Sequence, residues 1–366
     1  MPIKEKSFRI GCGRYLQGAN ILNEVADEIS RLGKAPLVVG GSTALELTRK
    51  SIEDSIKKKF GKYCICKHTS TCNDEEAQGI ATLAQKRGFD VIVGVGGGVI
   101  MDFAKLVAHY AELPIINVPT SSATCAAYTP LSVRYTRAGK TVGSIHYERE
   151  VNAVMVDTAI VAKQPTRLLL AGVFDALAKF VEIKHRFSTS QGDEQSYPLG
   201  LDWAYVMSRY SYSKLYEKTR EYLSKCETDP DSEVIDEVIF TLIAATGVIS
   251  GIARGSNQTA LAHKFYEATR VLFYEQSKPY LHGEIVGIGL LIQNVFNGER
   301  LENKALFDIM KQYGMPCRLS DIGIDADEKT IEAYYELMKK SSAALEGGID
   351  AEEKLKCALN HLLELE

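Results

Sequence analysis

Short apolar runs alternate with longer amphipathic segments through roughly the first 160 residues of the chain. The apolar runs predict buried strands at residues 36–40, 62–68, 89–95, 113–119 and 152–157. The segments between them predict helices at residues 43–60, 74–87 and 102–110. Right-handed crossovers join strands that alternate with helices, so the pattern indicates a parallel sheet covered by helices on both faces.

The alternation is interrupted once and then ends. Residues 131–137 and 140–146 flank a glycine-containing turn, which is a hairpin signal. After Pro165 the sequence is helical almost throughout, and helical spacing of apolar residues is clear in 235–252 and 355–365. The architecture therefore changes from mixed to helical at the end of the last predicted strand.

This change defines two predicted domains. We expect an N-terminal α/β domain over residues 1–162 and an all-helical C-terminal domain over residues 163–366. Neither an internal repeat nor a low-complexity linker separates them. The cleft between two such domains is the expected ligand site.

Composition narrows the class of protein. The chain has 366 residues, 45% of them hydrophobic, and a formal net charge of −4 with no strongly basic half. This charge argues against nucleic-acid binding. No uninterrupted apolar run reaches the roughly 18 residues of a membrane span, and no apolar core follows the first residues as in a signal peptide. We therefore expect a soluble cytoplasmic protein with no membrane or nucleic-acid partner.

One group of cysteines invites comparison with a zinc site. Cys64, Cys66, His68 and Cys72 lie close together in the sequence. Residues 63–67 have the pattern of a strand, however, so Cys64 and Cys66 would share one of its faces. We favour small apolar residues beneath a sheet over zinc ligands.

Five histidines lack a motif of their own. Four of them lie in polar contexts and are expected to be solvated: His68, His109, His185 and His361. His146 ends the predicted hairpin and is a candidate proton carrier, although a structural role is the more ordinary interpretation.

A glycine-rich turn is the first candidate functional motif. Residues 94–98 read Gly-Val-Gly-Gly-Gly, after a predicted strand and before the helix that carries Asp102 and Lys105. Glycines allow the backbone to approach a pyrophosphate, and a helix N-terminus offers free N–H groups and partial positive charge. The spacing is not that of the common G-x-G-x-x-G fingerprint, so a related but different nucleotide loop fits better.

The glycine turn begins an ordered series of motifs. The others are Asp102-x-x-Lys105, Val118-Pro119-Thr120, Val156-Asp157-Thr158, the run from Gly172 through Asp175 to Lys179, Ala262-His263 and Leu281-His282-Gly283-Glu284. In this order they resemble the iron-containing (group III) alcohol dehydrogenase superfamily. Within it the chain resembles glycerol dehydrogenase and, through residues 123–133, more closely hydroxycarboxylate dehydrogenase.

The resemblance implies an N-terminal Rossmann-like dinucleotide-binding domain and a helical domain that binds metal and carries out catalysis. It implies Asp175, His263 and His282 as the metal ligands and catalytic residues. One carboxylate and two imidazoles suit Zn²⁺ or Fe²⁺ and leave coordination positions open. NAD or NADP would exchange hydride with a small alcohol or carbonyl substrate. No general base can be assigned. A homo-oligomer is expected.

The resemblance also implies where the cofactor binds. The expected contacts are Gly41, Gly96, Gly97, Gly98, Asp102, Thr120, Thr129, Leu131 and Tyr135. Two departures bear on these contacts. Val99 stands where many relatives have Lys or Ser, which removes one polar contact. Gly41 stands where relatives that prefer NAD usually have Asp, so a 2′-phosphate would not be repelled and NADP(H) stays open.

A third departure bears on the substrate. Cys125 stands where glycerol dehydrogenases have an Asp that contacts glycerol. Losing that carboxylate weakens the case for a polyol and removes repulsion of an anionic substrate. We therefore expect a 2-hydroxy acid/2-oxo acid pair. Arg134 and Lys140 are candidate carboxylate partners, although a solvated charged face is the more ordinary role for them.

Three alternatives stay open. The first is glycerol dehydrogenase itself. The second is a dehydroquinate-synthase-like cyclase, which Asp175 in place of Glu and the lack of a basic cluster argue against; the same lack disfavours sn-glycerol-1-phosphate dehydrogenase. The third is a non-catalytic dinucleotide- or metal-binding sensor, for which Val99 and Cys125 are the only support.

Overall fold

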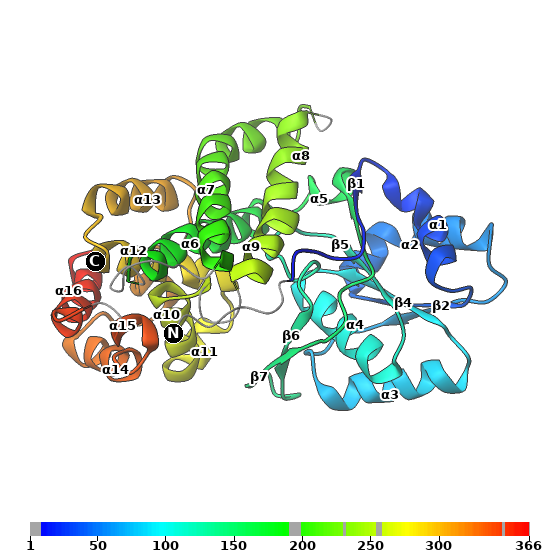
Figure 1. The fold of residues 1–366 in the computed structure, drawn as a ribbon, viewed down its shortest axis with the longest axis horizontal. Coiled ribbons are helices and arrows are strands. Elements are labelled where there is room, and N and C mark those ends of the chain that lie inside the picture. The colour runs from blue at the N-terminus through cyan, green and yellow to red at the C-terminus, as the bar shows by residue number, and fades with distance from the viewer. Residues whose placement is uncertain (1–8, 190–198, 230–231, 254–257, 346–347, 366) are drawn as a thin grey trace. The chain divides into compact units, whose positions relative to one another are not determined.

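The computed structural model describes residues 9–189, 199–229, 232–253, 258–345 and 348–365 (Figure 1). The chain divides into two compact units. The sheet unit comprises Ile10–Leu169 and Glu217–Val248. The helical unit comprises Arg9 and the described residues of Leu170–Tyr216 and Ile249–Glu366. These units describe packing; the functional domains 1–162 and 163–366 stay a prediction.

A parallel sheet of six strands forms the centre of the sheet unit. Its strand order is β1-β8-β5-β4-β2-β3. The bounds are β1 Tyr15–Gly18, β2 Pro36–Gly40, β3 Cys64–Lys67, β4 Val91–Gly96, β5 Ile115–Pro119 and β8 Ala153–Asp157. Five of these strands were predicted. Strand β1 was not, because its sequence Tyr-Leu-Gln-Gly is short and lies half-buried at the edge of the sheet.

The inner strands are buried on both faces. Every residue of β2, β4, β5 and β8 is buried, which explains why these segments read as continuous apolar runs. The covering elements before β5 are η1 Ile21–Glu24, α1 Val25–Leu32, α2 Ser42–Lys57, α3 Asp74–Lys86 and α4 Gly98–Ala111. Apolar side chains from α1 and α2, such as Ile29 and Ile52, join Val38, Val93 and Met155 in one core cluster.

The sheet has a topological switch point between β2 and β4. Strand β2 pairs with β3 on one side and with β4 on the other. The connections that leave β2 and β4 therefore run in opposite directions, and a crevice opens at the carboxyl ends of such strands. Gly41 and Gly97 follow these two ends, and the Gly41 N–H donates to the Val95 carbonyl at 3.1 Å.

The predicted hairpin is present. Strands β6 Leu131–Tyr135 and β7 Thr141–His146 form a separate antiparallel pair with an irregularity between Arg134 and Tyr135. Gly139 in the turn has φ +85°, a conformation that glycine adopts without strain. A short helix, α5 Thr158–Val161, follows β8.

The remainder is helical, as predicted. The elements are α6 Thr166–Thr189, α7 Leu199–Lys225, α8 Glu233–Phe240, a π-helical segment Thr241–Ala245, α9 Thr246–Ala253, α10 Leu261–Leu272, α11 Tyr274–Ser277, α12 His282–Phe296, α13 Arg300–Gln312, η5 Ser320–Ile322, α14 Glu328–Met338, α15 Ser342–Leu345 and α16 Ala351–Glu364. Helix α12 is buried along almost its whole length and is the core helix of the helical unit.

One helical stretch of the described chain is long and apolar enough to cross a membrane by those two criteria alone. It runs from Glu233 to Ala253, and 56% of its most apolar window is buried inside the protein. Such burial is ordinary for a core helix, so the stretch is weak evidence for a span.

Candidate functional site

The three predicted metal ligands come together in the helical unit. Asp175 lies on α6, His263 on α10 and His282 at the first position of α12. The Nε2 atoms of His263 and His282 each lie 3.3 Å from Asp175 Oδ1. Two ligands at about 2.1 Å from one tetrahedral ion are about 3.4 Å apart. Among the described residues this is also the one group of potential ligands with metal-site spacing.

Close helix packing brings the ligands together. A Cβ on Gly283 would overlap the backbone of Ala171 on α6, and a Cβ on Gly289 would overlap Ala262 on α10. Glycines at these positions therefore let α12 lie directly against both neighbouring helices. The start of α12 is fixed as well, because the Glu284 carboxylate accepts the Leu281 backbone N–H at 2.7 Å.

A buried carboxylate sets the protonation of His263. Glu182 Oε2 lies 2.5 Å from His263 Nδ1, and its Oε1 accepts the backbone N–H groups of Ala260 and His263 at 2.7 and 2.9 Å. Burial disfavours charge on Glu182, but the imidazole and these hydrogen bonds outweigh it and lower the pKa of Glu182. With the proton on Nδ1, the Nε2 lone pair of His263 faces Asp175 and suits a metal.

The environment of Asp175 fits a cation. Asp175 is buried, and no well-aligned hydrogen bond from the described residues reaches its Oδ1. Burial alone would raise the pKa of Asp175, but the Lys179 charge and the two imidazoles hold that pKa well below its usual value. An ionised, unsatisfied carboxylate oxygen between two imidazole nitrogens is a donor set that suits a divalent ion.

Lys179 and Glu182 lie beside these ligands, although no role was predicted for them from the sequence. Lys179 Nζ lies 3.3 Å from His263 Nε2, and both residues are buried. Asp175, Lys179 and Glu182 stand at positions i, i+4 and i+7 of α6, so they share one helix face. This helical spacing could have indicated both residues from the sequence. Lys179 ends the motif around Asp175, and Glu182 follows it by three residues.

The glycine turn follows β4 and leads directly into α4. Gly96 has φ +159°, and a Cβ there would lie 2.8 Å from Ile100. Helix α4 begins at Gly98, four residues before the predicted start, and no side chain caps its N-terminus. Its first N–H groups are therefore available to an anion. The Thr120 N–H donates to the Gly96 carbonyl at 3.0 Å, so Thr120 lies beside the turn.

Asp102 and Lys105 on α4 bind the backbone of residues 126–133. Lys105 donates to the carbonyls of Ala126 and Thr129 at 2.7 and 2.9 Å and also to that of Leu131. Asp102 lies 3.0 Å from Lys105 Nζ and accepts the Val133 N–H at 3.0 Å. The Asp102 carboxylate is thus engaged within the protein. Its predicted contact with the cofactor stays a prediction.

Most of the other predicted cofactor and substrate residues lie within or beside residues 126–133. Thr129 is buried, and Leu131 and Cys125 are half-buried. Tyr135 ends β6 and donates its backbone N–H to the Cys72 carbonyl at 2.8 Å. Gly41 lies apart from them, at the end of β2.

The two candidate carboxylate partners lie in the hairpin, where Arg134 is half-buried and Lys140 is exposed. Arg134 pairs with Asp74 at 3.3 Å. The hairpin residue His146 is exposed too.

Two of the histidines expected to be solvated are buried instead. His68 is buried, stacks on the Phe103 ring at 3.5 Å between centroids and bonds the Thr71 carbonyl. His185 is buried and bonds the Ala343 carbonyl at 2.9 Å. Cys64 and Cys66 are free thiols on the edge strand β3.

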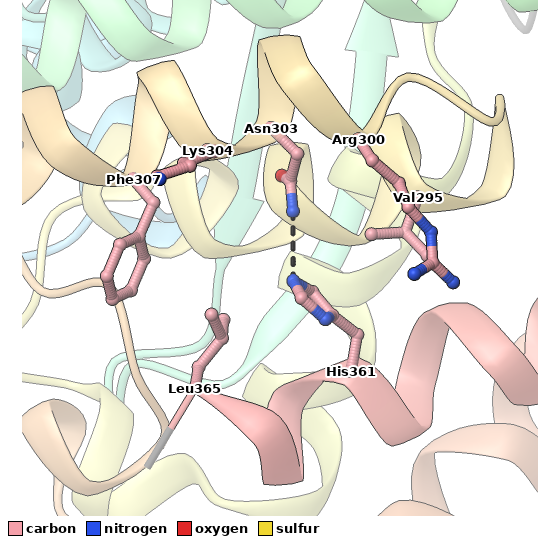
Figure 2. A pocket seen from close by; sticks show the side chains of 7 residues that line it. All are labelled: Val295, Arg300, Asn303, Lys304, Phe307, His361 and Leu365. Atoms are coloured by element: carbon pink, nitrogen blue, oxygen red, sulfur yellow. Dashed lines mark hydrogen bonds between the residues drawn. The ribbon is translucent and has the colours of Figure 1, made fainter.

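A pocket elsewhere in the helical unit has no catalytic features. Figure 2 shows it between α13 and α16, lined by Arg300, Lys304, Phe307 and other side chains. His361 in this pocket is half-buried and held by Asn303 at 3.0 Å and by Glu364 at 2.7 Å, so it also differs from the solvated state expected. None of the lining residues belongs to the metal-site cluster.

The fold and the site define a dinucleotide- and metal-dependent enzyme class, and comparison with known proteins identifies the family. Residues 12–158 match the model of iron-containing alcohol dehydrogenases. Glycerol dehydrogenase of Thermotoga maritima is 31% identical over 319 residues, which cover 86% of this chain and 84% of the relative. Hydroxycarboxylate dehydrogenase A of Escherichia coli is 30% identical over 263 residues, covering 70% and 69%.

Structural comparison agrees. A probable glycerol dehydrogenase from Sinorhizobium meliloti has a TM-score of 0.83 at 24% identity, with 99% of both chains covered. The chain belongs to the iron-containing alcohol dehydrogenase family. It is an oxidoreductase of the alcohol dehydrogenase class, acting on a small molecule with NAD(P) and a divalent metal. The names of its relatives favour the glycerol alternative over the 2-hydroxy acid expectation.

Proposed function

We propose that Asp175, His263 and His282 hold one Zn²⁺ or Fe²⁺ and that the chain transfers hydride between NAD(P) and a small α-oxygenated alcohol or ketone. The observation that carries the proposal is the 3.3 Å separation of both imidazole Nε2 atoms from Asp175 Oδ1. A metal there supplies Lewis acidity toward the oxygen on the reacting carbon, and nicotinamide supplies or accepts the hydride.

Two carboxylates of the chain position the proposed histidine ligands. Glu182 fixes the tautomer of His263, and Glu284 fixes the helix start that presents His282. His282 keeps 32% of its side chain exposed, whereas that of Asp175 is only 7% exposed, so the side of His282 is the proposed approach for a small molecule.

The cofactor is proposed to bind at the carboxyl ends of β2, β4 and β5. Gly96, Gly97 and Gly98 would face its pyrophosphate through the N-terminus of α4, with Gly41 and Thr120 beside them. The remaining proposed contacts come from Asp102, Thr129, Leu131 and Tyr135. Gly41 brings no carboxylate against a 2′-phosphate, which supports use of NADP(H) as well as NAD(H).

Glycerol and dihydroxyacetone are the first proposed substrate pair. Glycerol dehydrogenases recur among the relatives that cover most of this chain, which supports this pair.

A 2-hydroxy acid and its 2-oxo acid are the second candidate. Two observations favour it: Cys125 brings no carboxylate to the proposed substrate position, and Lys179 places a buried cation beside the metal ligands. The similarity to hydroxycarboxylate dehydrogenase A is consistent with it.

A parallel assay tests the proposal. Protein supplied with Zn²⁺ or Fe²⁺ is mixed with NADH or NADPH and with dihydroxyacetone, 2-oxobutanoate or 2-oxoglutarate, and cofactor absorbance is followed. We expect oxidation with at least one of these ketones and its loss in Asp175→Ala. Bound metal with no turnover on any of them would instead favour the non-catalytic sensor.

We also propose a homo-oligomer. Four large side chains on α7 are more than half exposed: Leu199, Trp203, Val206 and Tyr210. Their alternating four- and three-residue spacing is that of a helix face that packs against a second helix, and a second copy presents the same stripe. Light scattering of wild type and Val206→Glu tests this: wild type should be larger than a monomer, and the variant should dissociate.

A further inference from the structure

Lys179 is a buried cation with little to bind. Its residue is 6% exposed, and its ammonium carries three donors. Within the part of the chain that the structure describes, its one hydrogen-bond acceptor is His263 Nε2, at 3.3 Å. A buried charge is costly unless it is paired and hydrogen-bonded.

That single contact cannot persist in the loaded enzyme. His263 Nδ1 is committed to Glu182, so Nε2 offers one lone pair. This lone pair cannot serve both a metal ion and the Lys179 ammonium. When the proposed metal is bound, Lys179 needs another acceptor close to the reacting position.

The nearby carboxylates do not provide a free one. Glu182 Oε2 is taken by His263 Nδ1, and its Oε1 already accepts two backbone N–H groups. Asp175 is itself a proposed ligand. An acceptor that arrives with the substrate satisfies Lys179 without disturbing either carboxylate.

The charge of the centre indicates what that acceptor is. A divalent ion together with Asp175 and Glu182, both ionised, would be neutral. Lys179 adds one positive charge to this buried group, and a substrate that brings one negative charge restores neutrality. A carboxylate supplies that charge and two acceptor oxygens, whereas a hydroxyl supplies an acceptor oxygen without charge.

We propose that Lys179 binds the carboxylate of a 2-oxo or 2-hydroxy acid on the carbon next to the reacting one, and that it determines the preference for such substrates. The inference rests on the proposed metal site and deepens the second candidate function. In the reduction, hydride from NAD(P)H and a proton from solvent convert the ketone to a hydroxyl group. The carboxylate is unchanged and serves for binding alone.

Two ketones with the same four-carbon skeleton separate charge from shape. In 1-hydroxybutan-2-one a CH₂OH group replaces the carboxylate of 2-oxobutanoate. We expect Lys179→Met to lower kcat/KM for 2-oxobutanoate by about tenfold to a hundredfold and to change that for the hydroxyketone far less. Lys184→Met is the matched control: it lies on the same helix, pairs with Glu299 and should leave both values unchanged.

Binding gives a second readout that does not depend on turnover. Oxamate carries the same carboxylate beside a carbonyl but is not expected to be reduced. Calorimetric titration of oxamate into Zn²⁺-loaded protein with bound NADH or NADPH should show the same loss of affinity in Lys179→Met, at unchanged zinc content. Lys179→Gln provides a second neutral variant if the first does not fold, and oxamate binding by the wild type tests the inference without any variant.

The outcomes separate the two proposals. If the wild type reduces the hydroxyketone but neither reduces 2-oxobutanoate nor binds oxamate, the role of Lys179 is wrong and the metal-dependent dehydrogenase stands. Equal losses on both ketones in Lys179→Met would also contradict a role in charge recognition. A wild-type protein that takes up no metal and reduces neither ketone would overturn the proposed function, and the inference with it.

Discussion

Glu182 and His263 form a buried carboxylate–imidazole pair, with Glu182 Oε2 2.5 Å from His263 Nδ1. Glu182 is fully buried, and its second oxygen accepts the backbone N–H of Ala260, just before α10, and that of His263, in the first turn of α10. The pair therefore fixes both the orientation of the ring and the position of its proton. Partners of this kind raise the affinity of a histidine ligand for its metal.

Glu182→Gln should weaken metal binding. The amide oxygen can still accept from Nδ1, but the charge that makes the imidazole a stronger ligand is lost. We expect the dissociation constant for Zn²⁺ to rise about 10- to 100-fold, measured by competition with a chelator. Glu267→Gln on the surface of α10 is the control, since Glu267 pairs only with Lys264 among the described contacts. Unchanged affinity in Glu182→Gln would contradict the role of the pair.

Gly289→Ala should disturb the packing of α12 on α10. The added methyl group would overlap the Ala262 backbone, next to His263, so the helices must separate. We expect a loss of about 1–3 kcal/mol in the free energy of unfolding together with weaker metal binding. Gly79→Ala is the matched control, because a Cβ on this α3 residue meets nothing within 4 Å and should stabilise the helix by about 0.5–1 kcal/mol. Urea titration measures the free energy of unfolding of both variants.

Lys105→Met should destabilise the sheet unit. The variant leaves the buried Asp102 carboxylate without its cation and frees three backbone carbonyls. Breaking a buried pair on one side costs about 3–5 kcal/mol. The double variant Asp102→Asn/Lys105→Met should be more stable than Lys105→Met alone, since no uncompensated charge remains. Equal stability of the two would mean that the carbonyl contacts, not the ion pair, carry the effect.

His68 should make the protein less stable as the solution becomes acidic. Burial lowers the pKa of His68, although the Thr71 carbonyl and the Glu76 carboxylate act in the opposite direction. The unfolded chain therefore takes up a proton near pH 6.5, where the folded chain does not. Stability is then lost as the pH falls below about 6.5.

The slope of stability against pH tests this. His68→Phe keeps an aromatic ring against Phe103 but cannot be protonated. Its free energy of unfolding should fall less between pH 7.5 and pH 5.5 than that of the wild type. His146→Gln changes an exposed histidine and should leave the slope as it is. A steeper slope in His68→Phe would show that the sign is wrong.

The alternation of apolar and amphipathic segments was sufficient to predict the parallel sheet, because buried strands such as Val91–Gly96 carry no polar face. It failed for Tyr15–Gly18, a half-buried edge strand of four residues. The prediction that His68 and His185 are solvated was wrong as well. Polar neighbours in the sequence suggested solvent, but adjacent residues in a helix or loop face different directions, so neighbours do not report burial.

The metal-site cluster depended on a different kind of information. Asp175, His263 and His282 are far apart in the chain, and spacing alone cannot bring them together; the resemblance to a family did. Lys179 and Glu182 were within reach of periodicity, since they follow Asp175 by one and two helical turns. Their role became clear only from their short distances to His263 on another helix, which a pattern along α6 cannot reveal.

Lys105 holds its segment through main-chain oxygens rather than side chains. Every amino acid offers the same carbonyl, so these three hydrogen bonds do not depend on the side chains of residues 126, 129 and 131. Substitutions at Cys125, the proposed substrate position, can therefore be tested for altered substrate choice while these three hydrogen bonds stay in place. The side chain proposed to select the substrate and the contacts that position the neighbouring backbone are thus separate features of the chain.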